Sequence, residues 1–209
     1  MIRILIADDH EVVRRGLKQI LAETPDMIVT DEAVQGEEVL DKVNCKAFDV
    51  VLLDISMPGK SGLDVLKQLR SIRPQLPVLV LSIYPEEQYA IRVLKAGASG
   101  YLTKESAPEE LISAIRKVSS GRKYITPSLA EKLAHQLDLT SERPLHEILS
   151  DREYQVMVMI ASGKTAKEMA ESLSLSVKTV STYRSRIIEK MGMKNNAELV
   201  RYAIQNNLL

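Results

Sequence analysis

The sequence predicts an α/β domain over the first 120 residues, followed by a small all-α domain. In the first part, short apolar runs, typical of parallel strands buried on both faces, alternate with longer stretches of helical period. Five such strand-then-helix units in a row indicate a parallel sheet with helices on both faces. In the second part, from Leu149 onward, no strand pattern remains. A chain of 209 residues has room for two small domains of this kind.

The expected strands are five apolar runs, at residues 2–7, 27–29, 50–53, 78–81 and 101–102. Each expected helix has apolar residues on one face. In chain order, these faces consist of Val12, Val13, Leu17, Ile20 and Leu21; Val39, Leu40 and Val43; Leu63, Leu66, Leu69 and Ile72; Ile91, Leu94 and Ala98; and Leu111, Ile112, Ile115 and Val118. The strand order 2-1-3-4-5 would place the first and third strands side by side.

The second domain is expected to contain four helices, near residues 151–161, 165–172, 177–191 and 196–206. Ser150 and Glu153 match a capping box, and Thr165 suits a helix start. Gly163 and Gly192 stand where C-terminal caps belong. We therefore divide the chain into a first domain at 1–120, a linker at 121–146 with a helix near 128–137, and a second domain at 147–209.

Charge and cysteine content restrict the function classes. Formal net charge is −3 over residues 1–120, from 15 basic and 18 acidic residues, and +2 over residues 147–209, from 9 and 7. A mildly basic second domain permits nucleic-acid binding. A single cysteine, Cys45, excludes an internal disulfide and a multi-cysteine zinc site, as fits a reducing cytoplasm. No apolar run approaches the roughly 20 residues that span a bilayer, so no membrane association is expected.

Polar side chains stand at the carboxyl ends of the expected strands. Asp8 and Asp9 follow the first strand and Asp54 the third, while Ser82 ends the fourth and Lys104 follows the fifth. In an open α/β sheet these ends share one edge, where ligands bind. Carboxylates that lie so close together need a cation to offset their charge, and their hard oxygen ligands suit Mg²⁺. Lys104 adds a positive charge that can meet a phosphate. We expect His10 to start a helix beside this site rather than to bind metal.

With these residues, the first 120 positions resemble the receiver (CheY-like) domain of two-component signalling. The matching features are Asp8-Asp9, Asp54 after Val-Val-Leu-Leu, Met57-Pro58-Gly59 with Gly62, Ser82 after Leu-Val-Leu, and Lys104 after Gly-Tyr-Leu-Thr.

The resemblance implies a role for each matching position. Asp54 accepts a phosphoryl group, and Lys104 contacts the phosphoryl oxygens. Asp9, Asp54 and the backbone carbonyl of Ser56 bind Mg²⁺, with Asp8 assisting. The remaining two positions form a switch, with Ser82 as its hydroxyl and Tyr101 as the aromatic side chain that changes rotamer. Such a protein is not an enzyme, although it accepts a phosphoryl group and can catalyse its own dephosphorylation.

The expected helix at 177–191 has two different faces. An apolar face would pack on the preceding short helix, at Ala166, Met169, Ala170 and Leu173, and it consists of Val177, Val180, Ile187, Ile188 and Met191. The opposite face displays small hydroxyls among cations, which suits a DNA major groove. We expect Ser181, Thr182 and Ser185 to meet base edges. Phosphate contacts are expected from Lys178, Thr179, Tyr183 and Arg186. Arg184 falls toward the packed side, with a partly buried stem, and is kept as a further contact.

This second half resembles the LuxR-type helix-turn-helix, and the two resemblances together correspond to the NarL/FixJ layout. They rest on Leu149 to Tyr154, Gly163 to Ala170 and Leu175 to Arg184. Ala166 and Tyr183 depart from the Asn and His that many members carry. The resemblance implies a response regulator whose phosphorylation by a sensor histidine kinase switches DNA binding and transcription. It also implies a homodimer when phosphorylated, with RNA polymerase as a further candidate partner.

The sequence leaves two alternative functions open. The first is a nucleotide- or flavin-binding enzyme of flavodoxin-like fold, but it would need a phosphate-binding loop after the first strand. Asp8-Asp9-His10-Glu11 stands there instead, and no G-x-G-x-x-G occurs. The second is a DNA-binding protein whose receiver only binds other proteins, but no residue of the acidic site is missing. The receiver occupies the place of a lactone-binding domain, which argues against a small-molecule inducer.

Overall fold

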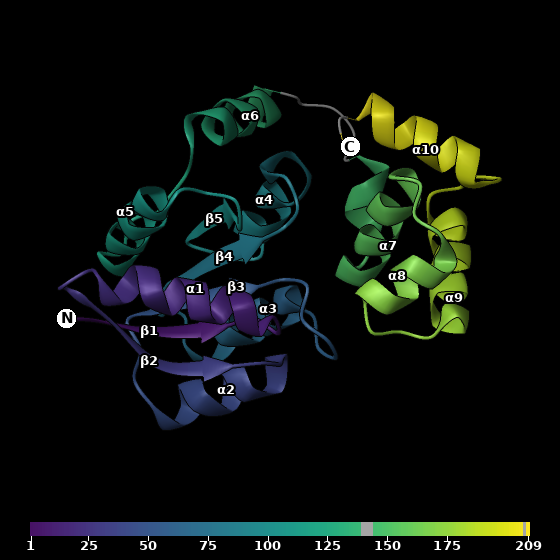
Figure 1. Cartoon of the computed structure of the whole chain (residues 1–209). Coiled ribbons are helices and arrows are strands. Elements are labelled where there is room, and N and C mark those ends of the chain that lie inside the picture. The colour runs from purple at the N-terminus through teal and green to yellow at the C-terminus, as the bar shows by residue number, and fades with distance from the viewer. Residues whose placement is uncertain (139–143, 207) are drawn as a thin grey trace. The chain divides into compact units, whose positions relative to one another are not determined.

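The computed structural model describes residues 1–138, 144–206 and 208–209. The chain forms two compact units, Met1–Leu133 and Ala134–Leu209. The first unit contains a parallel sheet of order β2-β1-β3-β4-β5, which confirms the predicted topology. Its strands are β1 (Ile2–Ala7), β2 (Met27–Ala33), β3 (Val50–Asp54), β4 (Val78–Ser82) and β5 (Gly100–Thr103). Figure 1 shows these strands beside the helices that connect them.

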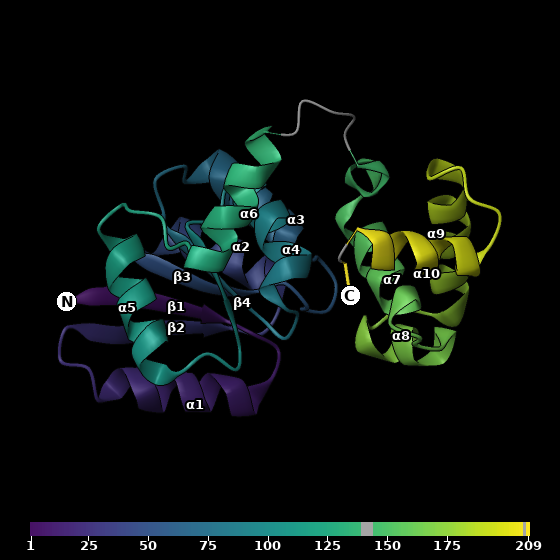
Figure 2. The same ribbon diagram turned by 90° about the horizontal axis from the view of Figure 1, so that it is seen from above.

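Helices cover both faces of the sheet, as Figure 2 shows. One face carries α1 (Glu11–Ala22) and α5 (Pro108–Ser119), and the other carries α2 (Gly36–Cys45), α3 (Gly62–Ile72) and α4 (Glu86–Lys95). Strands β3 and β4 are buried along their whole length, as continuous apolar runs predict. On the α1 and α5 face, the core includes Ile4 and Leu52 from the strands and Leu21 and Ile115 from the helices. This packing holds the carboxyl ends of the strands at one edge.

Strand β2 is longer than its apolar run, because it continues beyond Val29 to Ala33. It lies at the edge of the sheet, where polar residues are tolerated, and Asp31 and Glu32 pair with Leu5 and Ile6 of β1. The extension was not predicted, because backbone pairing rather than side-chain hydropathy defines it.

Several residues assigned to apolar faces are exposed. The exposed fractions are 83% for Val12, 43% for Ile72 and 47% for Val177. Each lies within two residues of a helix end, where the helix has not yet met, or has already left, the surface on which it packs. The predicted apolar faces were therefore wrong at these three positions, while the central residues Leu17, Leu66 and Val180 are buried.

The predicted face of the fourth helix was wrong in a different way. Helix α4 buries Tyr89, Ala90 and Val93, whereas Ile91 and Leu94 are only partly buried. The prediction aligned these two residues with Ala98, which is buried but lies beyond the end of the helix at Lys95. The helical period therefore did not extend to Ala98.

Helix α6 (Pro127–Asp138) spans the division between the two units. The second unit then contains η1 (Leu145–Ile148), α7 (Asp151–Ala161), α8 (Ala166–Ser172), α9 (Val177–Lys190) and α10 (Asn196–Gln205). The four helices from α7 onward match the predicted ones. Capping boxes are present at Ser150 with Glu153 and at Thr165 with Glu168. Gly163 and Gly192 take φ values of +80° and +64° after α7 and α9, as glycine C-caps do.

The short helix η1 was not predicted. Residues 139–143 of the predicted linker lie outside the described residues, and the domain boundaries at 120 and 147 stay a prediction. Among the described residues, no helix combines the length and apolar character needed to cross a membrane.

Candidate functional site

An ammonium group joins two buried carboxylates at the carboxyl edge of the sheet. Lys104 Nζ, just after β5, lies 2.6 Å from Asp8 Oδ2 and 2.7 Å from Asp54 Oδ2. Asp8 follows β1 and Asp54 ends β3, and each residue is only 1% exposed. The strand order brings these residues together, although 50 positions separate Asp54 from Lys104 in the chain.

The electrostatics of this centre are unfavourable for Asp54. Burial raises the pKa of its carboxyl group, Lys104 opposes this effect, and the negative charge of Asp8 adds to it. The pKa is raised overall. For Lys104, burial by itself would lower the pKa, but the two carboxylates raise it. Lys104 therefore stays charged, while the ionised form of Asp54 is held at an energetic cost.

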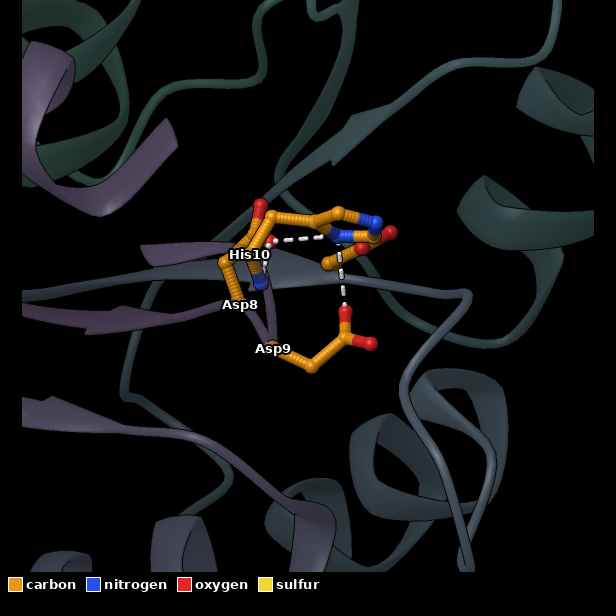
Figure 3. Close-up of side chains that lie close together, drawn as sticks. Asp8, Asp9 and His10 are labelled. Carbon is orange, nitrogen blue, oxygen red and sulfur yellow. Dashed lines mark hydrogen bonds and ion pairs between the residues drawn. The ribbon is translucent and has the colours of Figure 1, made fainter. Parts of the chain in front are cut away.

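Asp8, Asp54 and Lys104 form the acidic centre, and Asp9 and His10 extend it toward solvent. The side chain of Asp9 is 30% exposed, and His10 Nδ1 lies 3.0 Å from Asp9 Oδ1 and 3.2 Å from Asp8 Oδ1 (Figure 3). His10 is the N-cap residue of α1, as expected, and its backbone N–H donates to Asp8 Oδ1 at 2.9 Å. Asp8, Asp9, His10 and Asp54 offer ligand atoms that all lie within 4.8 Å of one another.

This donor set fits a hard divalent cation. Three carboxylates supply oxygen ligands of the kind that Mg²⁺ prefers, and Asp9 leaves one side open to water. The Ser56 backbone N–H donates to Asp54 Oδ1 at 2.9 Å, which places the loop after β3 against the same carboxylate. The role of the Ser56 carbonyl as a ligand stays a prediction.

The loop that follows Asp54 depends on Gly62. A Cβ at this position would lie 2.2 Å from the backbone oxygen of Asp54 and 2.6 Å from Ile55 Cα. Such approaches are too close for any side chain, so only glycine lets α3 begin this near to Asp54. Gly59 in the same loop has a φ of +73°. The glycines of the sequence motif therefore shape the backbone around the acidic centre.

Ser82 and Tyr101 both contact the backbone of Tyr84, which was not predicted as a site residue. Ser82 Oγ accepts a hydrogen bond from Tyr84 N at 3.1 Å, and the Tyr101 hydroxyl donates to Tyr84 O at 2.7 Å. Tyr101 is 1% exposed, and burial raises the pKa of its phenol. The segment between β4 and α4 thus contacts both residues. No sequence motif marks Tyr84, because its backbone rather than its side chain makes these contacts.

Helix α9 presents the expected polar surface. Lys178, Ser181, Thr182, Ser185 and Arg186 are exposed, while Thr179 and Tyr183 are partly buried. Its hydroxyls donate to carbonyls one turn back, since Ser181 binds Val177 O and Thr182 binds Lys178 O, each at 3.0 Å. Ser185 binds Ser181 O in the same way, at 3.1 Å. These hydroxyl oxygens keep lone pairs that can accept hydrogen bonds from base amino groups.

Arg184 differs from its expected environment. The residue is exposed rather than partly buried, and its Nε donates to Asn196 Oδ1 of α10 at 2.6 Å. The start of α10 lies beside this part of α9 and offers a polar partner where the helical wheel suggested apolar packing.

An ion pair that was not predicted joins α9 to α7. Lys190 Nζ lies 2.7 Å from Glu153 Oε2, and the same oxygen accepts the Ser150 backbone N–H at 2.8 Å. The capping-box glutamate of α7 thus also binds the last turn of α9. Sequence spacing signals the cap but not the lysine, which is 37 positions away.

Comparison with known families gives two matches within the chain. The family described as response regulator receiver domain matches residues 4–116. The family described as bacterial regulatory proteins, luxR family, matches residues 147–203. The acidic centre lies within the first match and helix α9 within the second.

Curated relatives match over the whole chain. Response regulator UvrY of Escherichia coli (strain K12) is 38% identical over 209 residues, covering 100% of this chain and 96% of UvrY. Oxygen regulatory protein NreC of Staphylococcus carnosus (strain TM300) is 40% identical over 214 residues, covering 99% of each chain.

Two solved structures are similar along the chain. The response regulator ChrA of a heme-sensing two-component system has a TM-score of 0.54 at 31% identity and covers 100% of this chain and 98% of its own. RcsB from Salmonella enterica serovar Typhimurium, bound to promoter P1flhDC with the phosphomimetic BeF3-, has a TM-score of 0.60 at 26% identity. In that case 96% of this chain and 97% of RcsB are covered.

Proposed function

Since this chain belongs to the response regulators that join a receiver domain to a LuxR-type DNA-binding domain, we propose that Asp54 is its phosphoryl acceptor and that phosphorylation controls DNA binding through α9. The observation that carries the proposal is the contact of Lys104 with both Asp8 and Asp54 at the edge of the sheet. This contact places a cation beside the carboxylate that would receive the phosphoryl group.

The transfer follows from the chemistry of these side chains. An Asp54 carboxylate oxygen attacks the phosphorus of a phosphohistidine on a sensor kinase, so that an O–P bond forms as the N–P bond breaks. Lys104 lies 2.7 Å from Asp54 Oδ2 and can pair with the phosphoryl oxygens. Asp8, Asp9, Asp54 and the Ser56 carbonyl would hold Mg²⁺, which neutralises charge on the transferring group when bound. Hydrolysis of the acyl phosphate returns the free carboxylate.

The response to phosphorylation begins at Ser82. The phosphoryl group adds charge and acceptor oxygens next to β4, and the Ser82 hydroxyl can donate to them. Its oxygen now accepts from Tyr84 N, and Tyr84 O accepts from Tyr101. Moving Ser82 therefore disturbs the segment that leads into α4, and Tyr101 can change rotamer with it. A small shift there biases the surface formed by α4, β5 and α5 between two arrangements.

On DNA, the exposed residues of α9 divide between two tasks. Lys178, Thr179, Tyr183 and Arg186 contact phosphates and set the register, with Arg184 as a further contact. Ser181, Thr182 and Ser185 meet base edges in the major groove. A phosphorylated homodimer would match a two-fold related site. In this role the protein acts in the cytoplasm, where a bacterial chromosome lies, with RNA polymerase as a candidate partner.

Intact mass and sedimentation test the proposal on the full chain. Purified protein is treated with Mg²⁺ and a small acyl-phosphate donor, and Asp54→Ala serves as the control. We expect a Mg²⁺-dependent gain of one phosphoryl group in the wild type, none in the variant, and dimer formation with the gain. Phosphorylation without dimerisation would remove the dimer step alone. If a control receiver is labelled and this protein is not, the receiver serves as a binding module instead.

A further inference from the structure

A partly buried arginine on α1 contacts the backbone of the acidic centre. The Arg14 side chain is 12% exposed, and its Nη1 donates to the carbonyl oxygen of Asp8 at 2.9 Å. Its Nε donates to Glu32 Oε2 on β2 at 3.0 Å. The planar guanidinium therefore spans from the edge strand of the sheet to the first residue of the Asp8-Asp9 pair.

The other groups of Asp8 are also held in place. Its backbone N–H donates to Ala33 O at 3.1 Å, next to Glu32 in β2. Its carboxylate accepts the His10 N–H at 2.9 Å and contacts Lys104 at 2.6 Å. Both backbone groups of Asp8 are therefore hydrogen-bonded, the N–H to Ala33 and the carbonyl oxygen to Arg14. These contacts set the direction of the chain toward Asp9.

We propose that Arg14 is a positioning residue for the cation site: by holding the Asp8 carbonyl against Glu32, it sets the placement of the Asp8 and Asp9 carboxylates and thereby the affinity for Mg²⁺. The inference rests on the proposed function, because that function assigns the cation to these carboxylates. The Arg14 guanidinium contacts Asp8 O and Glu32 Oε2, and neither atom is a carboxylate oxygen of the acidic centre. It acts through the backbone of Asp8.

Geometry and charge make opposite predictions for Arg14. Its positive charge by itself opposes a nearby divalent cation, so losing the charge alone would strengthen Mg²⁺ binding. Losing the positioning would weaken it. Arg14→Lys separates the two effects, because lysine keeps the charge but has a single ammonium, which cannot reproduce the fixed fork that binds Asp8 O and Glu32 together.

Lys18 provides a matched control one turn further along α1. Its Nζ contacts the other oxygen of the same glutamate, Glu32 Oε1, at 2.5 Å, and its side chain is 44% exposed. Lys18→Met therefore removes a cation and an ion pair from Glu32 while leaving Arg14 on Asp8. Glu32→Gln tests the same contact from the other side, since it keeps Arg14 but weakens the hydrogen bond and ion pair between Arg14 and residue 32.

Calorimetric titration of the full-length protein with MgCl₂ tests the inference, and urea unfolding of each variant without metal supplies the readout of stability. We expect Arg14→Lys to bind Mg²⁺ about tenfold more weakly than the wild type, as is usual when a group supporting metal ligands is lost. Glu32→Gln should bind with intermediate affinity. Lys18→Met should bind at least as tightly as the wild type, even if it loses as much stability as Arg14→Lys.

The outcomes separate this inference from the proposed function. Wild-type affinity in both Arg14→Lys and Glu32→Gln would overturn the positioning role and leave Asp54 phosphorylation unaffected. Equal weakening in Lys18→Met and Arg14→Lys would also overturn it, since the effect would then follow from general destabilisation. A wild-type protein that binds no Mg²⁺ would overturn the inference together with the metal assignment. If Arg14→Lys does not fold, Arg14→Gln decides, because loss of the charge alone predicts tighter Mg²⁺ binding than in the wild type, whereas loss of the positioning predicts weaker binding.

Discussion

The two units each contain a buried carboxylate paired with a lysine, and the two pairs behave differently. Asp54 and Lys104 in the first unit are 2.7 Å apart, as are Glu153 and Lys190 in the second. Nevertheless, the pKa of Asp54 is raised above its ordinary value and the pKa of Glu153 is lowered. The distance between the charged groups therefore does not decide whether an ion pair favours the ionised carboxylate.

The surroundings of each carboxylate account for the difference. Asp54 is buried and shares its lysine with the negative charge of Asp8. Burial also acts to raise the pKa of Glu153, but Lys190 and the Ser150 backbone N–H and hydroxyl outweigh it. In addition, the Lys190 side chain is 43% exposed, so its charge keeps part of its hydration. The first pair holds an ionised carboxylate at an energetic cost, and the second joins two packed helices.

The largest effect on stability is expected from breaking the second pair. Glu153→Gln should lower the free energy of unfolding at pH 7 by about 2 kcal/mol, because it removes charge-assisted hydrogen bonds to Lys190 and Ser150. A lowered pKa in the folded state means that this stability is present above the unfolded-state pKa and is lost as pH falls through the folded-state value. Chemical denaturation across pH measures it.

Glu168→Gln is the matched control for this prediction. Glu168 occupies the same capping-box position in α8 and contacts Thr165, and it is exposed. We expect a clearly smaller loss from this variant. Equal losses in the two variants would show that the cap, and not the lysine, gives Glu153 its importance.

The opposite sign is expected for the first pair. Asp54→Asn should raise the free energy of unfolding by about 1 kcal/mol at pH 7.5 in EDTA, because it removes a carboxylate whose ionised form is held at a cost, while Lys104 keeps Asp8 as its partner. A raised pKa in the folded state means that the ionised carboxylate destabilises the protein above that pKa. The gain from the variant should therefore shrink as pH falls toward the unfolded-state pKa. A gain that is constant across pH, or a loss at pH 7.5, would contradict this account.

A carboxylate with a neutral partner should have a smaller effect. The Thr126 hydroxyl donates to both oxygens of Glu86 on α4, at 2.7 and 2.8 Å, and accepts the Leu129 N–H at the start of α6, at 3.2 Å. Thr126→Val should cost about 0.5 kcal/mol, at the low end for a lost helix cap. Hydrogen exchange measures the effect: amides at the start of α6 should exchange faster in Thr126→Val but not in the neighbouring control variant Ser128→Ala. Unchanged exchange would mean that other contacts hold α6.

The smallest effect on stability is expected on the exposed face of α9. Arg186→Ala should change the free energy of unfolding by less than about 0.5 kcal/mol, as surface substitutions usually do. It should nevertheless reduce the slope of log binding constant against log salt concentration by about 1, because one phosphate contact is lost. Titration of fluorescent promoter DNA at several salt concentrations measures this. An unchanged slope would remove Arg186 from the phosphate contacts, and Glu189→Ala on the same helix face is the control.

The sequence by itself determined the order of helices and strands, the caps at Ser150 and Thr165, and the presence of acidic residues at strand ends. These features follow from local periodicity and from hydrogen bonds between residues a few positions apart. For the same reason the exposed hydroxyls and cations of α9 could be predicted from a helical wheel. The predictions failed at some helix ends, as at Val12 and Val177, where the period continues but the packing surface does not.

Only the tertiary structure decided which charged groups meet and at what energetic cost. The contacts of Arg14 with Glu32 and of Lys190 with Glu153 join residues 18 and 37 positions apart, and no sequence pattern marks them. Lys104 and Asp54 were expected at the same edge of the sheet, but their direct contact was not predicted. Each depends on how whole helices and strands pack, which local patterns do not specify. The pKa direction of a buried carboxylate depends in turn on every charge and hydrogen bond around it, so it is settled only when packing brings those groups together.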